Sequence, residues 1–163
     1  MEEIQLEFKV RTYHSIEELP ENRQKLLRLA REAAERAYAP YSGYRVGASV
    51  LLENDEIITG NNQENAAYPS GLCAERTALF YASSRYPGVP VRSIAVSTLL
   101  NEPLSGDFAK PCGGCRQVMA EYEDLSGKPI EIILDGSSVI MVMDGIDALL
   151  PFRFKKEALT KKR

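Results

Sequence analysis

The three cysteines of this chain lie in two short segments whose spacing suits a metal ion. Cys112 and Cys115 form a C-x-x-C motif, and Cys73 stands well upstream of them. Zn²⁺ prefers sulfur and nitrogen ligands in a tetrahedron, and a catalytic zinc ion keeps one of its four positions for water. Residues three apart on the first turn of a helix share a face, so both sulfurs of the motif can reach one ion. Three thiolates therefore predict a zinc site with one open position.

Two charged side chains follow the first of these cysteines directly. Glu75 lies two positions after Cys73, and residues two apart do not face each other on a regular helix. Both can point at one metal ion only if Cys73 stands at the start of the helix. Free N–H groups and the positive end of the helix dipole then point at the site as well. Arg76, three positions after Cys73, shares its face and would offset the net negative charge of three thiolates on Zn²⁺.

Four segments, in this order along the chain, resemble the cytidine deaminase family in its three-cysteine branch. CAERTA at 73–78 and PCGGCRQ at 111–117 match the two metal motifs of that family, in which a glutamate is the general acid and base. PYSGYRVGA at 40–48 and NQENAAY at 62–68 match two further segments. The resemblance covers roughly residues 38–154 and implies a zinc-dependent cytidine deaminase.

The implied reaction is the hydrolytic deamination of cytidine or deoxycytidine to uridine or deoxyuridine, with release of ammonia, as in pyrimidine salvage. One zinc ion per subunit, bound by Cys73, Cys112 and Cys115, would lower the pKa of its water. Glu75 would take a proton from this water, pass it to N3 of the base and later protonate the departing amine. A carboxylate that acts as base and acid needs a pKa near the working pH, so we expect Glu75 to be buried with its pKa raised.

The resemblance also implies contacts to the substrate. Tyr44 stands where the family usually has a phenylalanine against the pyrimidine ring, and the backbone around Ala74 would read the edge of the base. Asn62 and Glu64 are two apart and point the same way in an extended backbone. An amide beside a carboxylate suits the vicinal hydroxyls of ribose. We therefore expect this pair to bind the sugar.

Members of this branch are homotetramers with their sites at subunit boundaries. By that analogy Phe154 would stack on the base bound by a neighbouring chain, and Phe152 competes with it for this role. We therefore expect a homotetramer whose small-molecule partner is a nucleoside.

The composition fits one globular domain over residues 1–163, with 1–19 as an N-terminal extension and 155–163 as a basic tail. A hydrophobic content of 44% and a charged content of 26% are ordinary for a soluble domain. A net charge of −3 and a pI near 5.3 argue against a nucleic-acid-binding protein. No apolar run approaches the length of a transmembrane helix, about 20 residues. The acidic start and the odd number of cysteines favour a cytoplasmic protein with metal-binding thiols.

The apolar pattern predicts an α/β fold. Helices are expected over 21–38, 73–85 and 112–122, and strands over 46–52, 56–60, 91–98, 130–134 and 139–143. The expected fold class is a three-layer α/β/α sandwich with a mixed five-stranded sheet, in agreement with the resemblance. Ligands in open sheets bind where strands end and helices begin, and both cysteine segments lie at such places. A loop over 99–110 has no assigned role.

Three other interpretations stay open on the residues. A related deaminase of another amino-pyrimidine, of the blasticidin type, would keep the zinc residues and change the ribose contacts, although the amide–carboxylate pair favours a nucleoside. His14, the only histidine, would close a structural zinc site in a non-enzymatic protein. The C-x-x-C motif could serve thiol–disulfide exchange, which would leave Cys73 and Glu75 without a role.

Overall fold

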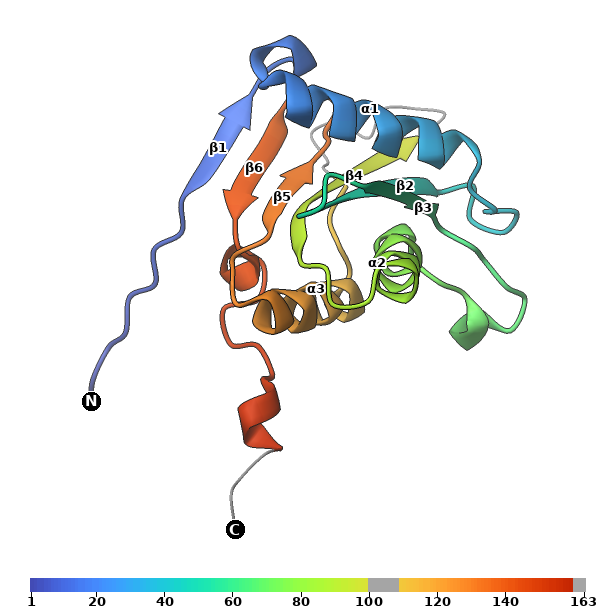
Figure 1. Ribbon diagram of the computed structural model, residues 1–163. Coiled ribbons are helices and arrows are strands. Elements are labelled where there is room, and N and C mark those ends of the chain that lie inside the picture. The colour runs from blue at the N-terminus through green and yellow to red at the C-terminus, as the bar shows by residue number, and fades with distance from the viewer. Residues whose placement is uncertain (100–108, 160–163) are drawn as a thin grey trace.

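The computed structural model describes residues 1–99 and 109–159, and within them the strands form one mixed sheet (Figure 1). Its order is β1-β6-β5-β4-β2-β3, and β4 and β5 are its parallel pair. The strands are β1 (Val10–Tyr13), β2 (Arg45–Leu52), β3 (Ile57–Asn61), β4 (Val91–Leu99), β5 (Glu131–Leu134) and β6 (Ile140–Asp144). The expected mixed sheet is confirmed, with six strands in place of five.

The sixth strand comes from the residues expected to be an N-terminal extension. β1 lies at the edge of the sheet, antiparallel to β6, with Val10 opposite Met143. An ion pair with two hydrogen bonds, of 2.7 and 2.8 Å, joins Arg11 to Asp144 across this edge. The strand has four residues that alternate between exposed and half-buried positions. So short and exposed a segment carries little of the apolar pattern that predicts a strand, which is why five strands were expected.

Helices cover both faces of the sheet, so the expected three-layer arrangement is confirmed (Figure 1). α1 (Glu21–Glu35) packs on one face, and α2 (Ala74–Arg85) and α3 (Gly113–Ser126) pack on the other. Short 3-10 helices complete the described elements: η1 (Ile16–Glu18), η2 (Tyr68–Ser70), η3 (Ile146–Ala148) and η4 (Lys156–Ala158). In the parts of the chain that the structure describes, no helix is both long and apolar enough to span a membrane.

The helix ends differ most from the prediction. α1 ends at Glu35 instead of continuing to 38, and α3 continues to Ser126 instead of ending at 122. Gly127, with a φ of 65°, ends α3 in the left-handed conformation that glycine adopts without strain. The predicted loop over 99–110 lies almost entirely outside the described residues.

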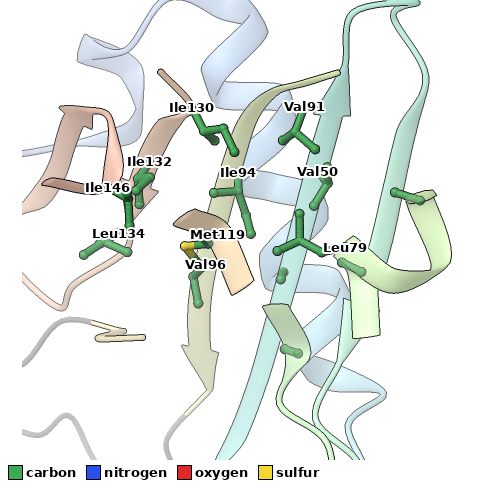
Figure 2. Close-up of a cluster of buried hydrophobic side chains, with 14 of the residues drawn as sticks. Val50, Leu79, Val91, Ile94, Val96, Met119, Ile130, Ile132, Leu134 and Ile146 are labelled. Carbon is green, nitrogen blue, oxygen red and sulfur yellow. The ribbon is translucent and has the colours of Figure 1, made fainter. Parts of the chain in front are cut away.

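The sheet separates two apolar clusters. The larger cluster fills the space between the sheet and α2 and α3, where Val50 and Ile94 meet Leu79 and Met119 (Figure 2). The smaller cluster lies under α1 and includes Leu27, which is fully buried. Burial on both faces holds the strands in place. It thereby also fixes the strand ends at which the functional residues gather.

Two glycines let the helices approach the backbone of the sheet closely. A Cβ added at Gly47 in β2 would lie 2.0 Å from the carbonyl oxygen of Ala30 and 2.3 Å from the nitrogen of Ala34 in α1. A Cβ added at Gly60 in β3 would lie 2.5 Å from the nitrogen of Ala78 in α2. These two positions therefore need glycine, which has no Cβ, so that α1 and α2 can pack directly against the strands.

Candidate metal centre

Cys73 and Cys112 each stand at the N-cap of a helix. Cys73 precedes α2 with φ −72° and ψ 152°, and Cys112 precedes α3 with φ −67° and ψ 166°. Both residues are extended, which the spacing to Glu75 requires of Cys73, and Cys115 follows on the first turn of α3. The first N–H groups of both helices and the positive ends of their dipoles therefore point toward the cysteines.

The three sulfur atoms lie together. The Sγ of Cys112 is 3.7 Å from that of Cys73 and 3.5 Å from that of Cys115, and all three lie within 4.8 Å of one another. In a tetrahedral site with Zn–S bonds of about 2.3 Å, neighbouring sulfurs stand about 3.8 Å apart. The cluster therefore fits a zinc ion bound by three thiolates, with one position left for water.

Arg76 places a positive charge against this cluster. Its Nη2 lies 3.5 Å from the Sγ of Cys73. A hydrogen bond from the Cys115 thiol, with further contributions from Arg76 and Cys112, lowers the pKa of Cys73 to about 5. The same hydrogen bond, together with burial, raises the pKa of the Cys115 thiol. The lowered pKa of Cys73 favours its thiolate, the form in which cysteine binds zinc.

Glu75 is buried beside the cysteines with a raised pKa, as expected. Its exposed fraction is 4%, and it lies on the first turn of α2, in the lining of the same cavity as Cys73. Burial raises the pKa of its carboxyl group, and the charge of the nearby Cys73 thiolate adds to the rise. A carboxyl group with a raised pKa can take up and return a proton during a reaction.

A cavity of about 850 Å³ opens in front of the cysteines. It lies where β2 begins and β4 ends, next to the N-terminus of α2. The expected site residues in its lining are Tyr44, Asn62, Glu64, Cys73, Ala74, Glu75, Arg76 and Cys112. The structure therefore brings together residues from distant parts of the sequence, in a volume typical of sites for small molecules.

Asn62 and Glu64 line the cavity and also hold its wall. The Oδ1 of Asn62 accepts the N–H of Val46 at 2.7 Å, and its Nδ2 donates to the carbonyl oxygen of Tyr44 at 2.9 Å. The carboxylate of Glu64 accepts the N–H of Tyr41 at 2.8 Å. An amide nitrogen carries a second hydrogen, and a carboxylate has about four acceptor sites, so both side chains keep capacity for a ligand.

Ser42 is a residue of the cavity lining that the sequence reasoning missed. Its hydroxyl donates a hydrogen bond to Glu64, and its Oγ accepts the N–H of Tyr44 at 2.9 Å. Its one signal in the sequence is its place in the segment PYSGYRVGA, two residues before Tyr44. Serine beside glycine is typical of ordinary turns, so this signal does not separate a site residue from a turn residue.

The two phenylalanines near the C-terminus lie outside the cavity of their own chain. Phe152 is 84% exposed, Phe154 is 57% exposed, and neither belongs to the lining. Arg153 between them donates to Glu123 of α3 at 2.8 Å. The Nε2 of Gln117 donates to the carbonyl oxygen of Phe154 at 2.9 Å. The backbone of this segment is therefore fixed on α3 while both rings remain exposed.

His14 does not take part in the cysteine cluster. It is exposed next to the end of β1, and its backbone N–H donates to the carboxylate of Glu18 at 2.9 Å. Among the described residues, the group that could hold a metal ion consists of the three cysteines. The interpretation in which His14 closes a structural zinc site is therefore wrong.

Comparison with known proteins gives consistent results. Residues 20–126 match the family described as the cytidine and deoxycytidylate deaminase zinc-binding region. A cytidine deaminase from Halalkalibacterium halodurans is 47% identical over 100 residues, which are 61% of this chain and 71% of that protein. One from Sporosarcina psychrophila is 39% identical over 138 residues, or 84% of this chain and 94% of that protein. The crystal structure of cytidine deaminase from Burkholderia pseudomallei superimposes with a TM-score of 0.66 and 36% identity, over 83% of this chain and all of that one.

Proposed function

Since the chain belongs to the cytidine and deoxycytidylate deaminase family, we propose that it hydrolyses the amino group of cytidine and deoxycytidine, giving uridine or deoxyuridine and ammonia. The observation that carries this proposal is the cluster of three cysteine sulfurs at two helix N-termini with Glu75 buried beside it. Removal of an exocyclic amine by water needs a strong nucleophile and a proton carrier, and this arrangement has a place for both.

The protein residues have separate roles in the reaction. Cys73, Cys112 and Cys115 hold the zinc ion, which when bound activates a water molecule as the nucleophile. Glu75 accepts a proton from the attacking water and passes it to N3 of the base; it then takes the proton of the new hydroxyl group on C4 and gives it to the departing amine. Its burial supports this role, because a raised pKa lets the carboxyl group hold the proton between the two transfers. The nearby guanidinium of Arg76 offsets the negative charge of the thiolates.

The substrate lies in the cavity with its base toward the cysteines. Tyr44 contacts the face of the pyrimidine ring, and the backbone around Ala74, buried at the first position of α2, reads the edge of the base. Asn62 and Glu64 bind sugar hydroxyls with the donor and acceptor capacity that their structural hydrogen bonds leave over.

The working enzyme is a cytoplasmic homotetramer of the pyrimidine salvage pathway. Phe154 of one chain stacks on the base bound by a neighbouring chain, and its exposure on a segment fixed to α3 supports this assignment. The free thiols of the cluster suit a reducing compartment.

Ammonia release from cytidine by the purified protein tests the function. We expect turnover by the zinc-loaded protein, loss of turnover after a chelator removes the metal, and recovery when zinc is added back. A sample that contains one zinc ion per chain but releases no ammonia from cytidine or deoxycytidine would contradict the proposal. Ammonia release by that sample from another amino-pyrimidine would point to the blasticidin type of deaminase.

A further inference from the structure

Ser42 connects two residues that contact the substrate in the proposed function. It lies in the turn that follows α1 and lines the cavity together with Tyr44 and Glu64. Its hydroxyl donates to the Oε1 of Glu64, and its Oγ accepts the backbone N–H of Tyr44 at 2.9 Å. One hydroxyl group therefore uses both its donor and an acceptor site to join the sugar side of the cavity to the base side.

Backbone groups strengthen the connection to Glu64. The Oε2 of Glu64 accepts the N–H of Tyr41 at 2.8 Å and that of Ser42 at 3.3 Å. Gly43, with a φ of 68°, turns the chain immediately after Ser42 in a conformation that other residues adopt with strain. The turn is thus attached to the carboxylate through two backbone N–H groups and one hydroxyl group.

Tyr44 is held from two sides. Ser42 accepts its N–H, and the Nδ2 of Asn62 donates to its carbonyl oxygen at 2.9 Å. Of the contacts to Glu64, the hydrogen bond from Ser42 contributes most to lowering the pKa of that carboxyl group. Loss of the Ser42 hydroxyl would release one side of Tyr44 and one oxygen of Glu64 at the same time.

We propose that Ser42 is a positioning residue that holds Tyr44 and Glu64 at a fixed spacing and so couples recognition of the base to recognition of the sugar. This inference rests on the proposed function, because Tyr44 and Glu64 contact the nucleoside there. Ser42 acts through these two residues. Groups held in place before binding lose less freedom when the substrate arrives, so the hydroxyl favours a nucleoside in which base and sugar are both present.

A double-mutant cycle tests whether Ser42 acts through Glu64. The values of kcat/KM for cytidine are measured for the wild type, Ser42→Ala, Glu64→Ala and the double variant. We expect Ser42→Ala to lower kcat/KM about tenfold, the usual size of the effect when a hydrogen bond to a charged group is lost. Most of this loss should be a rise in KM. In the Glu64→Ala background the same substitution should cost about twofold or less, because only the hydrogen bond from the Tyr44 N–H is then lost. An equal loss in both backgrounds would overturn the proposal.

A conservative variant separates the hydroxyl from general damage to the turn. Ser42→Thr keeps a hydroxyl that can donate and accept, so we expect it to recover most of the lost kcat/KM. Ser84→Ala removes an exposed serine near the end of α2 and should match the wild type. If Ser42→Thr were as impaired as Ser42→Ala while both variants melted like the wild type, the hydroxyl would not be the cause and the proposal would fail.

A measurement without substrate keeps this inference distinct from the proposed function. The carboxyl carbon of Glu64 is titrated by ¹³C NMR in the zinc-loaded wild type and in Ser42→Ala. We expect a higher pKa for Glu64 in the variant, because its main hydrogen-bond donor is lost. If the pKa of Glu64 is higher in Ser42→Ala but the wild type does not deaminate cytidine, the proposed function is refuted. The inference that Ser42 positions Glu64 then still stands. An unchanged pKa would overturn the inference whatever the activity.

Discussion

Glu75 has both the burial and the place in the chain that a proton carrier needs. Glu75→Gln keeps the size of the side chain but removes the group that takes up a proton. Because three cysteines hold the metal ion, we expect this variant to bind zinc like the wild type. Its deamination of cytidine should fall by about 10²- to 10⁴-fold, the usual contribution of a general acid–base group. Zinc content and ammonia release measure the two properties on the same sample.

Glu121→Gln is the matched control for this substitution. Glu121 is exposed on α3, outside the cavity lining, so its variant should keep both zinc and activity. A Glu75→Gln protein that retained a tenth or more of the wild-type turnover would refute the proton-carrier role. Loss of zinc in that variant would instead show that Glu75 supports the metal site.

Single residues differ in how far the sequence reveals them. The cluster of Cys73, Cys112 and Cys115 was predictable because metal coordination restricts the type and the spacing of the ligands together. The contact of Ser42 with Glu64 was not, because the two are joined only by a turn whose geometry the residue types leave open. The double use of Asn62, as the proposed sugar ligand and as a hydrogen-bond partner of Tyr44 and Val46, likewise appears only in three dimensions.

At the scale of elements, two helix starts make the site. α2 and α3 both begin immediately after a cysteine, so two sets of unpaired N–H groups face the same cluster. Their positive ends favour thiolates there, as the guanidinium of Arg76 does. The predicted helix start at Cys73 is confirmed. The prediction was possible because Cys73 and Glu75, two residues apart, can both face one metal ion only if Cys73 stands at the start of the helix.

The seat of α1 on β2 gives a prediction about stability. A Cβ at Gly47 would meet backbone atoms of α1 at 2.0 and 2.3 Å, and backbone cannot move aside as a flexible side chain can. Gly47→Ala would therefore push α1 off the sheet and separate Leu27 from its neighbours. We expect a loss of about 2–4 kcal/mol in the free energy of unfolding, at or above the upper end of overpacking effects. Urea denaturation of the zinc-loaded protein measures it.

Gly113→Ala is the control for the same change of residue. Gly113 is the first residue of α3, and a Cβ there would meet no atom within 4 Å. Alanine is the better helix former, so this variant should be as stable as the wild type or up to about 1 kcal/mol more stable. Equal stability of the Gly47→Ala and Gly113→Ala proteins would show that α1 can shift without cost.

At the scale of the whole molecule, the sheet order places the cavity. β2 begins where β4 ends because the two strands are antiparallel, and the cysteines at the starts of α2 and α3 meet at these strand ends. Alternation of helix and strand patterns was enough to predict three layers. It could not predict β1, because pairing with β6 depends on an edge that exists only in the folded sheet. The proposed association of chains would depend in the same way on surfaces formed after folding.

The exposed segment 152–154 carries a prediction about that association. If Phe154 stacks on a base bound by a neighbouring chain, Phe154→Ala should lower kcat/KM about tenfold to a hundredfold, as for other base–aromatic contacts. A chain with Glu75→Gln still supplies a normal Phe154, and a chain with Phe154→Ala still supplies a normal Glu75. A mixed oligomer of the two therefore contains sites in which both residues are intact. Coexpression with two affinity tags isolates such oligomers, and we expect their activity to exceed the average of the two parents.

The same experiment identifies which ring crosses the boundary between chains. If Phe152 were the residue that reaches the neighbouring site, the gain on mixing would appear with Phe152→Ala in place of Phe154→Ala. If the ring served the site of its own chain, mixing would recover nothing, because each site would still carry one defect. Activity equal to the average of the parents for both variants would contradict a shared site. Recovery requires that the two intact residues come from different chains, so a gain cannot arise from a monomer.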